Sequence, residues 1–154
     1  MEAFKHLRKL TVSNSSPYHS LRYIKVESGK AVASDSKIWA ELACDEADGY
    51  YDKEGAFVGS LDTLKYPKIT QDFFNRKGTT VSVRELLTRD RIPLYPSRPK
   101  GVKVVLLNNS TGVRVKDLAF ARQLGFDVLT LDSESSSLHG SIGDTKIVIT
   151  TFKG

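Results

Sequence analysis

The two ends of the chain carry the same short pattern, and this repetition constrains the fold more than any other feature of the sequence. An amphipathic helix is predicted for residues 2–10, followed by strands over 21–27 and 30–44. A second helix, predicted for 116–125, is followed by strands over 126–132, 137–143 and 146–152. A helix with one apolar face has to bury that face, and the neighbouring strands supply the sheet for it. We therefore expect two similar helix-plus-sheet units.

Both predicted helices carry basic side chains away from their apolar faces. The residues that recur at helical spacing and are expected to face the core are Ala3, Phe4, Leu7, Leu10, Leu118, Ala121 and Leu124. The basic residues on or beside the outer faces are Lys5, Arg8, Lys9, Lys116 and Arg122. Gly125 follows the second helix, where glycine commonly caps a helix end. Such helices could lie along phosphates, although basic side chains also keep ordinary surface helices soluble.

The remaining pattern predicts an α+β fold with two principal helices and about eight strands. Ser28-Gly29 predicts a tight hairpin turn, and residues 146–152 predict one closing strand. We expect a single domain over residues 1–154, with half-units at about 1–62 and 79–154 and a crossover at about 63–78. Residues 84–87 predict the start of a short helix, and the arginine- and proline-rich segment 84–100 as a whole predicts an additional exposed basic loop.

Charge is segregated along the chain, whose net charge is +5. Residues 1–30 carry a net charge of +4, 31–62 carry −6, 63–126 carry +9 and 127–154 carry −2. One surface could therefore attract polyanions while another repels them, and the alternative is a mildly basic protein with solvated loops. No apolar run is as long as a membrane span requires, and we predict a cytoplasmic protein without a signal peptide.

Residue patterns that carry catalysis are missing from the sequence. The three histidines are far apart and lack zinc-ligand spacing, and the acidic residues between 45 and 52 lack the spacing of a calcium loop. No phosphate-binding glycine loop, dinucleotide fingerprint or nucleophile elbow is present. Cys44 and Trp39 are each expected to be core residues. We predict a protein that is not an enzyme and has no cofactor or metal.

Four stretches together resemble a known family. They are residues 23–35 (YIKVESGKAVASD), 64–69 (LKYPKI), 113–121 (VRVKDLAFA) and 146–152 (KIVITTF). In this order they resemble the strand-turn-strand, the aromatic-proline crossover, the second helix and the closing strand of a DNA sliding clamp domain, in particular that of the bacterial DNA polymerase III beta subunit. The resemblance implies a DNA-clamp-like domain of two βαβββ-type half-units, with two helices packed on a curved antiparallel sheet.

The resemblance also implies a role for the basic helices. In sliding clamps such helices line a central hole and meet the DNA backbone, so Lys5, Arg8, Lys9, Lys116 and Arg122 become the DNA-binding candidates. A bacterial clamp subunit has three such domains and two subunits form the ring, so a ring made from this chain requires a homo-oligomer. The single-domain size would suit a phage or a mobile element.

Two functions remain open from the sequence. The first is a sliding-clamp-like processivity factor in DNA replication, which binds duplex DNA and works beside a polymerase or another replication protein. The second is a clamp-like interaction module that binds a replication or host-defence protein rather than DNA. In that case the contact is expected either at the acidic face formed by residues 45–54 or in the basic loop, at Arg89, Arg91 and Arg98.

Overall fold

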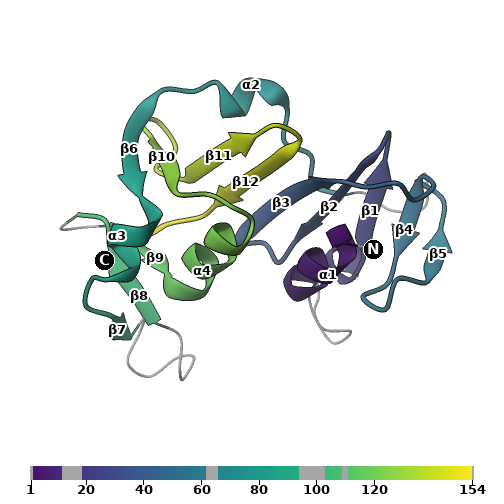
Figure 1. The fold of residues 1–154 in the computed structure, drawn as a ribbon, viewed down its shortest axis with the longest axis horizontal. Coiled ribbons are helices and arrows are strands. Elements are labelled where there is room, and N and C mark those ends of the chain that lie inside the picture. The colour runs from purple at the N-terminus through teal and green to yellow at the C-terminus, as the bar shows by residue number, and fades with distance from the viewer. Residues whose placement is uncertain (1, 12–18, 62–65, 94–102, 109–110, 154) are drawn as a thin grey trace. The chain divides into compact units, whose positions relative to one another are not determined.

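The structure, a computed structural model, describes residues 2–11, 19–61, 66–93, 103–108 and 111–153 (Figure 1). The chain divides into two compact units. The first comprises Met1–Phe73 and Ser141–Ile147, and the second comprises Phe74–Gly140 and Val148–Gly154. The tip of the hairpin formed by β11 (Leu138–Ile142) and β12 (Thr145–Ile149) thus belongs to the first unit and its base to the second.

The first unit is a helix on an antiparallel sheet. Its helical elements are α1 (Glu2–Leu7) and the 3₁₀ turns η1 (Arg8–Leu10) and η2 (His19–Arg22). Its strands are β1 (Ile24–Glu27), β2 (Lys30–Ser34), β3 (Ile38–Ala43), β4 (Gly49–Tyr51) and β5 (Phe57–Gly59). They lie in the order β5-β4-β1-β2-β3, and the residues of β12 that belong to this unit follow β3.

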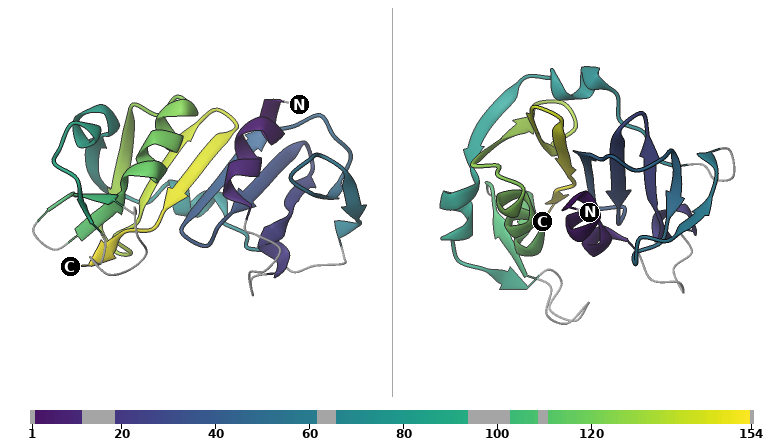
Figure 2. Two further views of the ribbon diagram at one scale, coloured as in Figure 1. Left: turned by 90° about the horizontal axis from the view of Figure 1, so that it is seen from below. Right: turned by 45° about the vertical axis from the view of Figure 1, so that its right-hand side comes forward.

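Small residues let α1 lie close to this sheet (Figure 2). The pairing of β2 with β3 places Ala31, Ala33 and Ala40 on one face, and all three are fully buried. Helix α1 packs against β2 and β3 and buries Phe4 and Leu7. The Phe4 ring meets the Tyr51 ring edge-on at a centroid distance of 5.0 Å, which fixes α1 against β4 as well.

The second unit contains two small antiparallel sheets and three helices. The helices are α2 (Gln71–Phe74), which begins in the first unit, α3 (Val83–Leu87) and α4 (Val115–Gln123). One sheet has the order β11-β10-β6, with β6 (Gly78–Ser82) and β10 (Val128–Asp132). The other has the order β13-β9-β8-β7, with β7 (Ile92–Pro93), β8 (Lys103–Leu106), β9 (Thr111–Arg114) and β13 (Phe152–Lys153).

The structure confirms the α+β class and the basic order of elements. The Ser28-Gly29 hairpin turn is confirmed, with positive φ values of 53° and 79° between β1 and β2. The apolar face of the first helix is confirmed, because Ala3, Phe4, Leu7 and Leu10 are all buried. Trp39 is buried as predicted, whereas Cys44 is only half-buried.

Several predicted boundaries are wrong, in both units. The first helix is α-helical only to Leu7, and the strand predicted for 21–27 begins at Ile24, the first β1 residue paired with β4. The single closing strand is in fact two, because β12 ends at Ile149 and β13 pairs with β9 in the other sheet. The described residues contain thirteen strands and four α-helices, more than predicted, since many of these elements are two to five residues long.

At the start of the basic segment 84–100, the short helix predicted from residue 84 is confirmed as α3. Further along this segment Ile92-Pro93 pair with β8 as strand β7, which was not predicted. Helix α3 begins after Ser82 because the Ser82 hydroxyl accepts a hydrogen bond from the Glu85 N–H at 3.2 Å, the usual serine cap. Residues 94–100 of the predicted loop lie outside the described residues.

A buried polar cluster in the second unit makes the folded state sensitive to pH. Asp132 and His139 are each 2% exposed, and the His139 Nε2 lies 3.8 Å from an Asp132 oxygen. Burial alone would raise the pKa of Asp132, but hydrogen bonds from Ser135 and from the Glu134 N–H, together with the Arg76 charge, lower it. Burial lowers the pKa of His139, opposed by Asp132 and assisted by Arg76.

Both shifts predict that the free energy of unfolding falls with falling pH. Because the folded pKa of His139 is below its ordinary value of 6.5, the unfolded chain binds the extra proton and stability declines as the pH drops below about 6.5. Asp132 adds a further decline as the pH falls below about 4. Urea unfolding at pH 7.5, 5.5 and 3.5 measures both. H139Q should remove most of the first decline, and an equal decline in wild type and H139Q between pH 7.5 and 5.5 would refute the assignment.

Candidate nucleic-acid interface

The first helix presents its basic side chains to solvent. Lys5, Arg8 and Lys9 are all exposed, and the apolar side chains between them are buried. Lys5 belongs to α1, whereas Arg8 and Lys9 belong to η1. The Thr11 N–H and hydroxyl both bond to the Arg8 carbonyl, at 3.4 and 2.9 Å, and so fix the end of this segment. Three cations therefore project from a stretch held down by its opposite side.

Helix α4 follows strand β9 with no linker, and an ion pair fixes the junction. Arg114 is the extended residue just before the helix, and Asp117 lies in the first helical turn. The guanidinium and the carboxylate form two hydrogen bonds, Nε to Oδ2 at 2.7 Å and Nη2 to Oδ1 at 2.9 Å. Their side chains are only 11% and 2% exposed, so this bidentate pair is shielded from water. It also places a negative charge where the helix dipole favours one.

The end of α4 is closed by a glycine cap, as predicted. Gly125 has a φ of +97°, its N–H donates to the Arg122 carbonyl, and the Phe126 N–H donates to the Ala121 carbonyl, both at 3.0 Å. These two bonds form the Schellman arrangement. Phe126 is 1% exposed, so the chain beyond the cap is anchored in the core. The last turn of α4, which carries Arg122, therefore has a defined end.

The exposed face of α4 is sparsely charged. Its basic side chains, Lys116 and Arg122, are exposed as predicted. At about 100° per residue they lie roughly 120° apart around the helix axis, with Ala119 and Gln123 exposed between them. The buried side also includes Phe120 and Asp117, which helical spacing alone did not assign to the core, whereas Leu124 is only half-buried. The face thus carries one cation on each side of a small, uncharged centre.

The structure describes two of the three arginines predicted to bind a protein partner, and they differ in their contacts. Arg89 is used within the fold, because its Nε donates to Glu85 at 2.9 Å and its Nη1 donates to the Leu106 carbonyl at 2.7 Å. Arg91 is exposed, and Arg98 lies outside the described residues. Arg84 belongs to the predicted basic segment but was not selected as a site residue, and it lies with Arg91 and Arg122 around an open hollow beside α3 and α4. The i, i+4 spacing of Glu85 and Arg89 was the available signal that Arg89 would be occupied.

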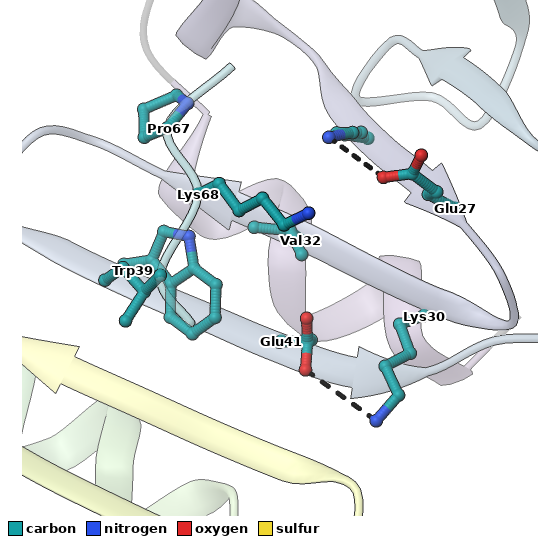
Figure 3. Close-up of a pocket in the computed structure, with 9 residues that line it drawn as sticks. Glu27, Lys30, Val32, Trp39, Glu41, Pro67 and Lys68 are labelled. Carbon is teal, nitrogen blue, oxygen red and sulfur yellow. Dashed lines mark ion pairs between the residues drawn. The ribbon is translucent and has the colours of Figure 1, made fainter. Parts of the chain in front are cut away.

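A second hollow, on the outer face of the first unit's sheet, carries paired charges (Figure 3). It is small, about 80 Å³, and lies above Val32 and Trp39, with Pro67 and Lys68 along its border. Lys25 pairs with Glu27 at 3.2 Å, and Lys30 pairs with Glu41 at 3.9 Å and with Asp144 at 3.5 Å. These paired charges largely neutralise one another, and Lys68 adds one positive charge at the border, so this hollow has only a weak net attraction for a charged ligand.

No metal site or membrane helix is found in the part of the chain that the structure describes. No group of three or more histidine, cysteine, aspartate or glutamate side chains in that part is arranged to hold a metal ion. The helices described there are too short or too polar to cross a membrane.

The fold is that of a DNA sliding clamp. A putative DNA polymerase III beta subunit from Eubacterium rectale matches with a TM-score of 0.59 and 12% identity, over 97% of this chain and 62% of that one. The beta subunit from Streptococcus pyogenes matches with a TM-score of 0.59 and 12% identity, over 99% and 62%. A Helicobacter pylori beta clamp bound to a DNA ligase peptide matches with a TM-score of 0.57 and 9% identity, over 99% and 64%.

The likeness to these clamps lies in the fold. No protein-family model matches the sequence, and no curated protein sequence is similar to it. The chain spans a little over three fifths of the length of the clamp subunits it matches. The matched structures named above are bacterial, so they lend no support to the predicted phage or mobile-element origin.

Proposed function

We propose that this chain is a non-enzymatic, sliding-clamp-like protein that associates with duplex DNA through backbone phosphates and serves DNA replication as a processivity factor. The observation that carries the proposal is the pair of helical segments α1–η1 and α4 in a clamp fold. Each buries its apolar side and presents lysine and arginine side chains to solvent. Such charges bind phosphates without reading bases, which suits a protein that has to hold DNA of any sequence.

The proposed DNA-contacting residues are Lys5, Arg8, Lys9, Lys116 and Arg122. All five are exposed, and each belongs to an element whose position is fixed by burial or by capping hydrogen bonds. We propose that residues 1–154 form one clamp-like domain with two half-units, and that encircling DNA requires several copies of the chain. A cytoplasmic location fits this role.

A replication protein is proposed as a further partner. The Helicobacter pylori clamp of similar fold is bound to a DNA ligase peptide, and a polymerase or a ligase is a comparable partner for this chain. The alternative, in which the chain binds such a protein in place of DNA through Arg89, Arg91 and Arg98, is weakened at Arg89. That guanidinium is already held by Glu85 and the Leu106 carbonyl.

Salt dependence of DNA binding tests the proposal. If all five cations meet phosphates, the logarithm of the binding constant should fall with the logarithm of the salt concentration at a slope of about −4.5 per bound chain. Affinity for a short duplex should then fall roughly 500-fold between 50 and 200 mM salt. Fluorescence anisotropy with duplexes of two unrelated sequences measures both the slope and the expected lack of sequence preference. Failure to bind at 50 mM salt would refute the proposal.

A further inference from the structure

An open hollow of about 660 Å³ lies beside α3 and α4, which pack against each other within the second unit. Three of the side chains that line it are arginines, Arg84 of α3, Arg91 just beyond it and Arg122 of α4. The lining also includes Thr88, Ala119 and Gln123. Three arginines thus line one concave surface, although they are 7 to 38 positions apart in the sequence.

The acidic groups of the two helices leave this positive charge uncompensated. Glu85 of α3 is held by Arg89 at 2.9 Å, and Asp117 of α4 is held by Arg114 at 2.7 Å. Neither carboxylate lines the hollow, and the described lining residues include no other carboxylate. Asp90, which is exposed, directly precedes Arg91 in the sequence and does not line the hollow either. The described lining therefore carries three positive charges and no negative one.

The three arginines of the lining favour a phosphate, and Leu87 and Val115 add an apolar part beside them. Guanidinium groups bind phosphate oxygens through paired hydrogen bonds, and the Gln123 amide also carries N–H donors, whereas the Thr88 hydroxyl already donates to the Glu85 carbonyl at 2.6 Å. Among the described residues that line the hollow there is no aromatic ring, so these residues offer no platform on which a base could stack. The small Ala119 side chain leaves room for the backbone of a bulky polyanion.

We infer that this arginine hollow is a phosphate subsite for duplex DNA that extends the basic face of α4 onto α3. The inference rests on the proposed function, because it names further backbone contacts of the same DNA. Arg122 connects the two parts, since it belongs both to the exposed face of α4 and to the hollow. An acidic protein segment would meet the same charges, but it would give no reason for the hollow to be continuous with the cationic helix face.

Replacing Arg84 and Arg91 tests the subsite, because neither is among the five residues proposed above to contact DNA. R84Q/R91Q should lower the salt slope of duplex binding by about 1.8, as expected for two lost phosphate contacts. Affinity at 0.1 M salt should fall roughly fifty-fold for the same reason. Both positions are exposed, and circular dichroism with a melting curve checks that the variant is folded. R84K/R91K keeps the charges and should keep the slope.

A charge-matched control separates a local contact from a general change of net charge. K53Q/K77Q removes two exposed lysines that belong to neither α1, α3 nor α4, and it should leave the slope nearly unchanged. If wild type binds DNA and R84Q/R91Q behaves like this control, the subsite is refuted while the proposed function stands. If wild type does not bind DNA at 50 mM salt, the proposed function fails and the subsite fails with it.

Discussion

Reversing the charges of Lys5, Lys9 and Lys116 to glutamate is expected to weaken binding to duplex DNA severely and to leave the protein folded. All three side chains are exposed, so the change removes three phosphate contacts and adds three repulsive charges without disturbing the core. The salt slope should fall by about 2.7, and affinity at 0.1 M salt should fall by more than about a hundredfold. Anisotropy titrations at several salt concentrations measure the effect, with a melting curve to check folding.

The matched control for this variant is K53E/K68E/K77E. It makes the same change in net charge at three exposed lysines outside α1 and α4. Long-range repulsion alone would weaken DNA binding equally in both variants, whereas local contacts predict a much larger loss in the first. Equal losses would show that α1 and α4 are ordinary solvated helices, and unchanged affinity in both would exclude an electrostatic interface.

Replacing Asp117 by asparagine is expected to lower the free energy of unfolding by about 3 kcal/mol, because it leaves the Arg114 guanidinium poorly paired in a shielded place. The pair joins the end of β9 to the first turn of α4, so its loss loosens the junction that positions Lys116. Urea unfolding at pH 7 measures the change. This variant should still bind DNA under conditions where it is fully folded, since Asp117 does not itself face solvent.

Two further variants distinguish a buried pair from a surface one. E85Q breaks the Glu85–Arg89 pair, whose side chains are 54% and 41% exposed, and it should lower stability by less than about 1 kcal/mol. R114M/D117L removes both buried charges and should be more stable than D117N, because no uncompensated ion remains. If D117N and E85Q have equal effects, the burial of the Arg114–Asp117 pair does not contribute to stability in the way described here.

The fold was largely predictable because its strongest signals are local. Helical spacing of Phe4 and Leu7 predicted the buried face of α1, and Ser28-Gly29 predicted a turn that needs positive φ values. The break between β12 and β13 was not predictable in this way. Residues 146–152 have a continuous strand pattern, and nothing local to them tells that Phe152 pairs with Gly112 in a different sheet.

The candidate interface was predictable only in part, for a similar reason. Exposure of Lys5 and Arg122 follows from the periodicity of their own helices. Which arginines of a basic segment are available depends on partners elsewhere in the chain. Arg89 donates to a carbonyl 17 residues later in the chain. Arg84 lies near Arg122 only because α3 packs beside α4. Asp117 has a polar side chain on the buried side, and only its pair with Arg114 explains that position.

The hydrogen bond from the Arg89 guanidinium to the Leu106 carbonyl has a consequence for variants of Arg89. Together with the pairing of Ile92 with Val104, it joins the residues after α3 to strand β8 at two points. A variant that loses the Arg89 side chain would keep the backbone pairing of β7 with β8, so the loss would loosen this connection without removing it.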